Sequence, residues 1–363
     1  MNKGFNLIAL DSSYQIIALL RCTNIQWNRK YYESGTFSLE IPLEQYDSSY
    51  QYIYTKDRPE MGRITQINFI NQSGYKAINL SGYFLENELN KRIVYRKGIS
   101  NIINGPSWMN QEGKAEDVAY AYFNAFKDVS ISQSGDTVYC ILGIESGQSL
   151  SRGKISNHER CGEKLGNKIY SILKPSEMSY RVSYDFQSNE KLFSVWSGYD
   201  RTQDQSDNNP VTFSTRYGNI KNPNILIETT NYCNSCIIDN ENNNTVYSRA
   251  LLSNGAEDED YIFSYVKSSV NKGDYDSDSA FYTAMESEGK KDLNERVKLI
   301  NVEFDAMEGS YEYMEDFDLG DKCNVEIPEV NISADAVLIG CYEVIKSGTH
   351  SLTLEFGEPI LRR

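Results

Sequence analysis

The chain has 363 residues, of which 24% are charged, and its formal net charge is −15 at pH 7. A chain of this length buries roughly three quarters of its unfolded surface, so its size does not limit the core. The length also predicts two or three domains. The acidic balance disfavours specific nucleic-acid binding and attachment to anionic membranes. The sequence predicts neither a secretory signal nor a membrane span. Its seven scattered cysteines indicate free, buried thiols.

Alternating apolar and polar residues predict strands in the first hundred residues. The pattern covers residues 5–9, 14–20, 25–27 and 36–41, and Pro42 ends the last strand or places it at a sheet edge. We therefore expect residues 1–100 to form a mostly antiparallel, barrel-like β domain. The 27 tyrosines suit half-exposed sheets and subunit contacts, because each joins an apolar ring to a hydroxyl group.

The segment from Gly62 to Arg96 predicts a hairpin followed by a short helical turn. Strands are expected on either side of residues 71–74, whose Asn, Ser and Gly favour a turn. We expect Gly82 to break the second strand as a pivot, either through a positive φ or through close packing. Apolar residues at helical spacing follow in residues 84–89, and a further strand is expected just after them.

Residues 101–208 predict a lateral α+β domain beside the first one. The expected elements are a loop at residues 101–113, helices at 115–127 and from Ser156 to Pro175, strands at 179–186 and 191–196, and a polar linker at 202–209. Ser156 and Glu159 match a capping box, which sets the predicted start of the second helix. Pro175 sets its end.

Residues 209–363 predict a second barrel-like β domain with a hairpin and helix insertion at about 240–297. The expected elements are strands near 211–213 and 225–227, hairpins at 234–270 with a tip at 242–244, a helix at 279–297, and strands at 297–304, 322–327, 336–345 and 351–356. Gly289 weakens the middle of the helix. The predicted fold class is a β-rich α+β chain with two β-barrel-like domains, a lateral α+β domain and a helical insertion.

No motif predicts a metal or a cofactor. Cys233 and Cys236 form one CxxC pair, whereas zinc needs four ligands, so structural thiols are expected. Residues 274–278 resemble the start of a calcium loop, but the glycine and glutamate that such a loop requires are missing, which favours a solvated loop that ends at a helix N-cap. The acidic residues 257–260 predict a solvated turn.

Known catalytic motifs are missing from the sequence as well. The two histidines, His158 and His350, lack the partners of a zinc protease motif, and no nucleophile elbow or phosphate-binding loop is found. A pair of carboxylates assembled in space stays possible, because a glycosidase site needs no sequence motif. We predict that the chain is not an enzyme.

Three short blocks together resemble a known family. The first block consists of Gly62-Arg63-Ile64, Ser81-Gly82, and then Leu85, Leu89, Arg92 and Ile93. The second block consists of residues 198–202, which include Asp200 and Arg201, followed by residues 210–214 and Asn219. The third block consists of residues 319–322, which include Gly320 and Asp321, and ends with residues 356–358 around Gly357. In this order the blocks are similar to the ReqiPepy-type siphovirus tail proteins. We take the glycines and charged residues just named as structural or assembly candidates.

The resemblance implies a baseplate or tail-tip hub, made in the bacterial cytoplasm and located in the virion tail or in a prophage-derived particle. It implies two β barrels per subunit and a homotrimer, whose pseudo-sixfold ring would match a hexameric tube. The implied partners are the tail tube or distal tail protein on one side and a spike, tip or tape-measure protein on the other. DNA would pass through the ring without specific binding, and no stable membrane insertion is expected.

Two other functions stay open, together with one local question. A tail-associated cell-wall hydrolase would need a catalytic centre, and a carbohydrate-binding receptor module would suit the many Tyr and Asn residues. Asp200 and Arg201 either fix a subunit contact by bidentate hydrogen bonding or form a loop salt bridge worth about 1 kcal/mol or less. Gly320 and Asp321 suit a turn that leads into a strand.

Overall fold

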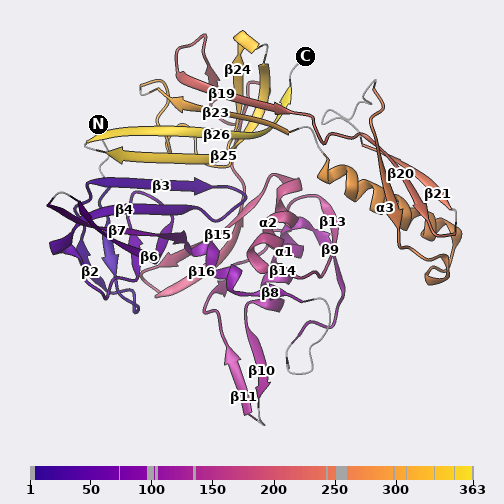
Figure 1. The fold of residues 1–363 in the computed structure, drawn as a ribbon, viewed down its shortest axis with the longest axis horizontal. Coiled ribbons are helices and arrows are strands. Elements are labelled where there is room, and N and C mark those ends of the chain that lie inside the picture. The colour runs from indigo at the N-terminus through magenta and orange to yellow at the C-terminus, as the bar shows by residue number, and fades with distance from the viewer. Residues whose placement is uncertain are drawn as a thin grey trace.

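The structure is a computed structural model of the chain (Figure 1). It describes residues 5–72, 74–95, 102, 105–133, 136–242, 244–250, 260–296, 299–307, 309–330, 332–346 and 348–361. The expected change of composition near Gly98 and the acidic residues 257–259 lie outside these ranges. The described chain is mostly β, with one large sheet, which confirms the prediction of a β-rich chain.

The large sheet draws strands from both ends of the chain. Its strands are β1 (Ile8–Leu10), β2 (Ile16–Leu19), β3 (Asn24–Lys30), β4 (Thr36–Pro42), β5 (Tyr52–Tyr54), β6 (Met61–Gln72), β7 (Tyr75–Phe84), β17 (Asp200–Arg201), β18 (Thr212–Ser214), β19 (Ile220–Glu228), β23 (Leu299–Ala306), β24 (Lys322–Ile327), β25 (Ile332–Lys346) and β26 (Thr349–Leu361). The order is β19-β23-β26-β25-β3-β4-β7-β6-β5-β1-β2, and β24 adds to β25 and carries β17 and β18 in parallel.

The antiparallel pair of β3 and β25 joins the N-terminal strands to the C-terminal ones. Trp27 lies opposite Glu343 in this pair, and Figure 1 shows the two strands side by side. Among the described residues the pairing order is open at β2 and at β19, so neither half closes into a hydrogen-bonded barrel. The two predicted barrels are therefore present only as two curved parts of one sheet.

Alternation along β3 and β4 explains why these segments are strands. Ile25 and Trp27 on β3 and Phe37, Leu39 and Ile41 on β4 are buried in one core, while the residues between them are at least partly exposed. This period of two places one face of each strand in the core. A second core lies under the C-terminal strands around Phe213 and Phe304.

The lateral unit packs against the sheet and contains both α1 (Ala115–Phe126) and α2 (Leu165–Leu173). Its other elements are the 3₁₀ helices η2 (Leu85–Lys91) and η3 (Lys174–Ser176) and the strands β8 (Ile93–Val94), β9 (Asn110–Lys114), β10 (Val129–Gln133), β11 (Asp136–Cys140), β12 (Glu145–Ser146), β13 (Ile155–Glu159), β14 (Glu163–Lys164), β15 (Ser179–Asp185) and β16 (Glu190–Trp196). The helical turn expected after Gly82 is confirmed as η2, and the strand expected after that turn is confirmed as β8.

The predicted start of the second helix at Ser156 is wrong. Ser156 and Glu159 lie in β13, which pairs with β9, and His158 therefore lies in a strand. The ladder with β9 satisfies the backbone groups that a capping box would have served. The helix begins nine residues later, at Leu165, and ends before Pro175 as expected.

The insertion forms a separate small unit of strands β20 (Ser235–Asn240), β21 (Thr245–Arg249) and β22 (Phe263–Ser268) with η4 (Lys272–Asp274) and α3 (Asp278–Glu295). The hairpin of β20 and β21 is confirmed, but β22 runs parallel to β20 and is no hairpin partner. Ser277 caps α3, as expected for the loop before it. A Cβ atom on Gly289 would lie 2.5 Å from Ile238 Cδ1, so this glycine lets the helix pack closely on the sheet.

The segment 202–209, predicted to be a linker, is held against the C-terminal strands. The Gln203 backbone N–H donates to Asn324 Oδ1 at 2.8 Å, and the Gln205 side chain bonds the backbone of Thr202 and Asn208. Thr202 is buried. These contacts make the segment part of the packed fold.

Candidate functional site

Gly62 and Gly82 make room for one aromatic ring in the N-terminal part of the sheet. A Cβ atom on Gly62 would lie 2.4 Å from Phe37 Cε1, and one on Gly82 would lie 1.9 Å from the Arg63 carbonyl oxygen. The expectation that Gly82 breaks its strand is wrong, because β7 continues to Phe84. Of the two reasons proposed for this glycine, the structure supports close packing.

Arg63 attaches the lateral unit to this sheet, and Arg92 ties together elements within the lateral unit. Arg63 Nη1 donates to Glu88 Oε1 at 2.9 Å, and Lys91 also pairs with Glu88. Although burial alone would raise the pKa of Glu88, these two cations hold it below its usual value. Arg92 donates from Nε to the Lys127 carbonyl at 3.0 Å and from Nη2 to the Cys140 carbonyl at 2.9 Å, so it fixes the end of α1 and of β11.

Arg201 pairs with Asp321, which is 120 positions away along the chain. Arg201 Nε lies 2.6 Å from Asp321 Oδ2, and the carboxylate also accepts from the Tyr199 and Asp318 backbone N–H groups. Asp321 is 1% exposed. Asp200 accepts from Thr202 instead. Two of the three sequence blocks thus meet within one chain, and Arg201 has an intrachain partner.

Gly320 turns the chain beneath Tyr31, and Gly357 allows close packing elsewhere in the sheet. Gly320 has φ +86°, and a Cβ atom there would lie 2.5 Å from Tyr31 Cε2. The Tyr31 hydroxyl donates to the Glu177 carbonyl at 2.9 Å, which ties the central strands to the lateral unit. A Cβ atom on Gly357 would lie 2.6 Å from Ile339 Cδ1. Both glycines therefore serve close packing at the joints of the fold.

A buried charge network at the β3–β25 junction was missed by the sequence analysis. Arg29 is 1% exposed, and it donates from Nε to Glu60 Oε1 at 2.7 Å and from Nη1 to Asp318 Oδ1 at 2.5 Å and the Tyr313 hydroxyl at 2.6 Å. Arg58 pairs with the fully buried Glu343 nearby. One sequence signal exists, because Arg29 continues the inward alternation of Ile25 and Trp27 on β3.

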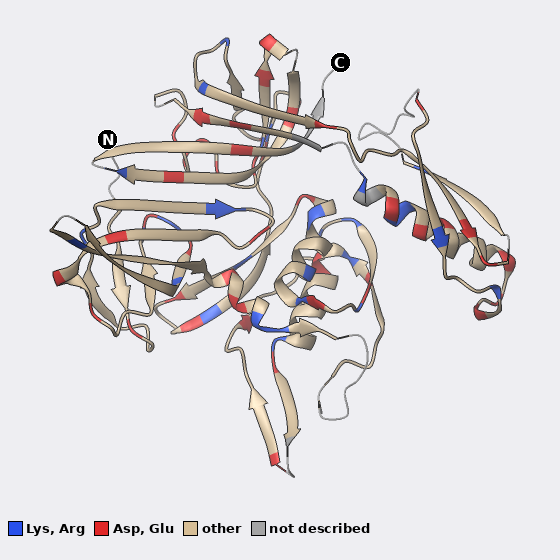
Figure 2. Ribbon diagram, in the orientation of Figure 1, with Lys and Arg blue, Asp and Glu red and all other residues tan. Residues whose placement is uncertain are grey.

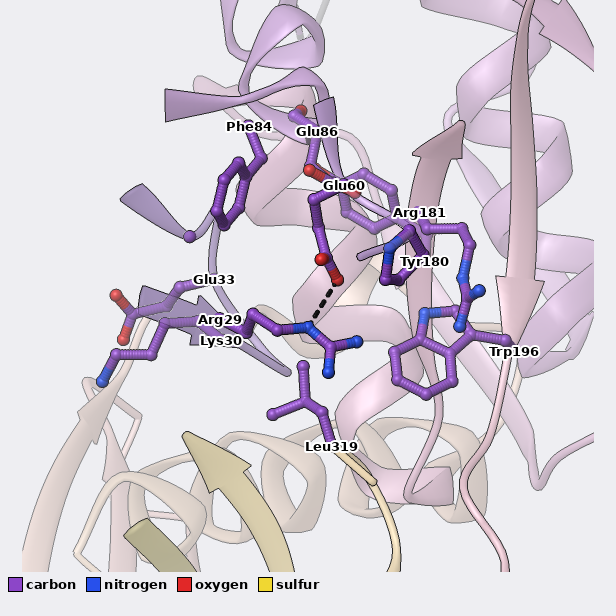
Figure 3. Close-up of a pocket in the computed structure, with 12 residues that line it drawn as sticks. Arg29, Lys30, Glu33, Glu60, Phe84, Glu86, Tyr180, Arg181, Trp196 and Leu319 are labelled. Carbon is purple, nitrogen blue, oxygen red and sulfur yellow. Dashed lines mark hydrogen bonds and ion pairs between the residues drawn. The ribbon is translucent and has the colours of Figure 1, made fainter. Parts of the chain in front are cut away.

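A small cavity lies beside this network, where the sheet meets the lateral unit (Figure 3). It holds about 20 Å³, enough for roughly one water molecule. Its wall contains Glu86, and burial together with the charge of Glu60 raises the pKa of this carboxyl to about 7. Glu86 Oε2 and Glu60 Oε2 have no hydrogen-bond partner among the described residues. The cavity is too small for a substrate, since ligand sites usually measure about 300–1,000 Å³.

Metal-binding and membrane-spanning features are missing from the part of the chain that the structure describes. It holds no group of three or more His, Cys, Asp or Glu side chains that could bind a metal ion. Cys236 is buried and Cys233 is partly buried, both as free thiols. No helix among the described residues is both long and apolar enough to cross a bilayer.

Comparisons with known proteins agree with this geometry. The model of the family described as Siphovirus ReqiPepy6 Gp37-like protein matches residues 8–358. No curated protein matches the sequence. The tail protein from Neisseria meningitidis MC58 has a similar structure, with a TM-score of 0.55 at 12% identity over 98% of this chain and 97% of that chain.

A second solved structure shows the same fold over nearly its whole length. The 43 kDa tail protein of prophage MuSo2 from Shewanella oneidensis has a TM-score of 0.57 at 10% identity, over 96% of this chain and 97% of that chain. At such low identity the likeness concerns the fold alone. The family match covers nearly all of the sequence, and the expected location in the virion tail is confirmed with it. The chain therefore belongs to the Siphovirus ReqiPepy6 Gp37-like family of phage tail proteins.

Proposed function

We propose that the chain is a structural tail-hub protein that assembles as a homotrimeric ring between the tail tube and the tip. The observation that carries this proposal is the single sheet, in which β3 and β25 join two curved halves into one body. Each subunit would present two barrel-like halves, and three subunits would present six. Closed threefold symmetry would then meet a hexameric tube with six similar contacts.

The two ends of the main strand order support a head-to-tail ring. β2 pairs only with β1 and β19 only with β23 among the described residues, and the two edges lie on opposite sides of the β3–β25 junction (Figure 1). Leu19 on β2 is 64% exposed and Leu226 on β19 is 48% exposed. Free edges with exposed apolar side chains favour pairing with another chain. A contact between β2 of one subunit and β19 of the next would repeat around a closed ring.

The charge of the chain supports passage of DNA through such a ring. Each chain carries −15, so three chains carry 3 × −15 = −45. Figure 2 shows Lys and Arg interspersed with Asp and Glu on strands and helices. A lumen lined by acidic or neutral residues would not retain DNA phosphates, whereas Lys and Arg would bind them through counterion release. The partners are the tail tube or distal tail protein on one side and a spike, tip or tape-measure protein on the other.

The geometry of the chain favours this structural role over hydrolysis. Glu60 and Glu86 line one cavity, as a pair of catalytic carboxylates would, but its volume of about 20 Å³ leaves no room for a sugar ring. Glu60 is also engaged by Arg29. We therefore propose no enzymatic activity and no cofactor for this chain.

Imaging of assembled tails tests the proposal. We expect three copies in the ring and an inner surface without a basic lining. Leu19→Glu and Leu226→Glu place a charge on the two edges and should reduce incorporation into tails, while Ile155→Glu, on β13 of the lateral unit at 69% exposure, serves as the control. Six copies in the ring, or a lumen lined with Lys and Arg, would contradict the model.

A further inference from the structure

The sheet of the insertion has an unusually apolar outer face. α3 covers one side of β20, β21 and β22, where Cys236, Ile238 and Phe281 form the core. The other side faces solvent, and the exposed side of such a sheet is normally polar. Here it carries aromatic side chains, with Tyr247 46% exposed and Tyr265 60% exposed.

Strand register places these side chains in rows. Tyr247 and Tyr265 both lie opposite Ile237 of the central strand, one on each side of it. Arg249 and Phe263 both lie opposite Ser235, in the adjacent row. Thr245 and Lys267 both lie opposite Asp239, in a third row, and we call the side chains of these three rows the outer face. Its apolar side chains are neighbours across three strands, so they form one continuous floor.

The outer face is also hollowed. An open depression of about 660 Å³ is lined by Ile237, Thr245, Val246, Tyr247, Arg249, Tyr261 and Phe263. That volume lies within the range of small-molecule binding sites. The rings of Tyr261 and Phe263 are 23° from parallel with centroids 6.3 Å apart, so they expose broad faces with similar orientation.

Polar groups surround the apolar floor and hold its rings in place. Arg249 lies over the Tyr261 ring at 3.9 Å and donates to its hydroxyl. The Tyr247 hydroxyl lies 3.2 Å from Ser235 Oγ, and the Tyr265 hydroxyl donates to Asp239 Oδ2 at 3.3 Å. The Arg249 guanidinium, the Asp239 carboxylate and the tyrosine hydroxyls thus border the aromatic surface, and each can bond a ligand hydroxyl. The Ser235 hydroxyl is buried and serves only to position Tyr247.

We propose that the outer face binds saccharides, with a pyranose ring lying flat on its aromatic floor. A β-linked pyranose with equatorial hydroxyls exposes an apolar face of C–H groups and a rim of hydroxyls. This matches a flat apolar floor with donors and acceptors at its border. Asp239 and Lys267 lie in the third row, at the border of this floor, where a carboxylate and an ammonium group can bond the hydroxyls of a sugar.

The proposal is independent of the trimeric ring, because each chain carries a complete outer face. If the ring forms, three copies would add avidity toward a polymeric glycan without new contacts. A failure of the ring model would leave the binding to a single chain unchanged, so the two proposals can be tested separately.

The test is titration of the full chain with cellotetraose and, separately, with chitotetraose. Calorimetry measures the Kd, and saturation transfer from the aromatic protons of the protein detects the stacked sugar. We expect at least one of them to bind with a Kd of about 1 mM or tighter. Tyr247→Ser and Phe263→Ser should each weaken binding about tenfold, since each removes one stacking surface. Phe263→Tyr keeps the ring and should retain binding.

The matched control is Tyr282→Ser, which removes a 36% exposed tyrosine from α3 in the same unit. It should leave the Kd unchanged. The proposal is overturned if neither oligosaccharide binds, or if binding survives Tyr247→Ser and Phe263→Ser undiminished. It is also overturned if those two variants instead dissociate a self-associated form of the purified chain, because the face would then be a protein contact.

Discussion

The buried carboxyl of Glu86 makes the stability of the protein depend on pH in a direction opposite to that of most carboxyls. Glu86 is 7% exposed, and burial, followed by the charge of Glu60, raises its pKa from 4.5 to about 7. Between these two values the folded state keeps a proton that the unfolded state has released. Stability therefore falls as pH rises through this window. The full shift corresponds to about 3 kcal/mol, because one pKa unit is worth about 1.4 kcal/mol.

Glu86→Gln isolates this effect, because the amide cannot titrate and has nearly the same shape. Relative to the unchanged protein, the variant should gain about 2.5 kcal/mol in the free energy of unfolding between pH 5 and pH 8, since part of the full shift falls below pH 5. Urea unfolding at pH 5, 6, 7 and 8 measures this difference. A difference that stays constant over that range would refute the reasoning about the cavity.

Glu88→Gln is the matched control, from the same 3₁₀ helix. The pKa of Glu88 is lowered by Lys91 and Arg63, so its stabilising effect is fully present above its unfolded value of 4.5 and is lost only as pH falls below it. This variant should lower stability by a constant amount between pH 5 and pH 8. A pH-dependent loss at Glu88 would show that the two carboxyls have been assigned the wrong environments.

The remaining predictions concern packing, the buried ion pair and metals. Gly82→Val should lower the free energy of unfolding by about 3 kcal/mol or more, because the new side chain meets the Arg63 backbone. Gly162→Val is the control: no atom lies within 4 Å of its Cβ position, so thermal unfolding should show a change of about 0.5 kcal/mol or less. Asp321→Asn should cost about 3–5 kcal/mol by leaving Arg201 unpaired. Lys267→Ala, which breaks an exposed pair with Glu241, should cost about 1 kcal/mol or less, and equal losses in the two variants would disprove the role of burial. Elemental analysis after dialysis should find neither zinc nor calcium, and stoichiometric zinc would contradict the assignment of Cys233 and Cys236 as structural thiols.

Local patterns in the sequence predicted most individual elements. The helix expected at residues 115–127 is α1, and the one expected at 279–297 is α3, because each has a local apolar stripe or a local N-cap. The error at Ser156 has a non-local cause, since β9, far earlier in the chain, supplies the backbone partners that make residues 155–159 a strand. Local capping signals do not report such partners.

The candidate residues were identified by type, but their partners were not. The sequence places Arg201 beside Asp200, yet its partner is Asp321, and the two meet because β17 pairs with β24. No local pattern identifies the partner of Arg29, because Asp318 is 289 positions away. Sequence spacing carries information about contacts within a helix or hairpin, whereas these pairs depend on how separate strands are arranged in the sheet.

The positions of these residues determine where assembly contacts should be sought. At Gly62, Gly82 and Gly320 the space of a side chain is filled by a ring or by backbone of another strand, and Asp321 is buried against Arg201. Such residues support the folded chain, so their substitution should reduce the amount of folded protein. The surfaces that we propose for assembly and for ligand binding lie elsewhere, at the edges β2 and β19 and on the outer face of the insertion respectively. Substitutions there should leave folding intact and change incorporation into tails or ligand binding, which separates the two classes of residue by experiment.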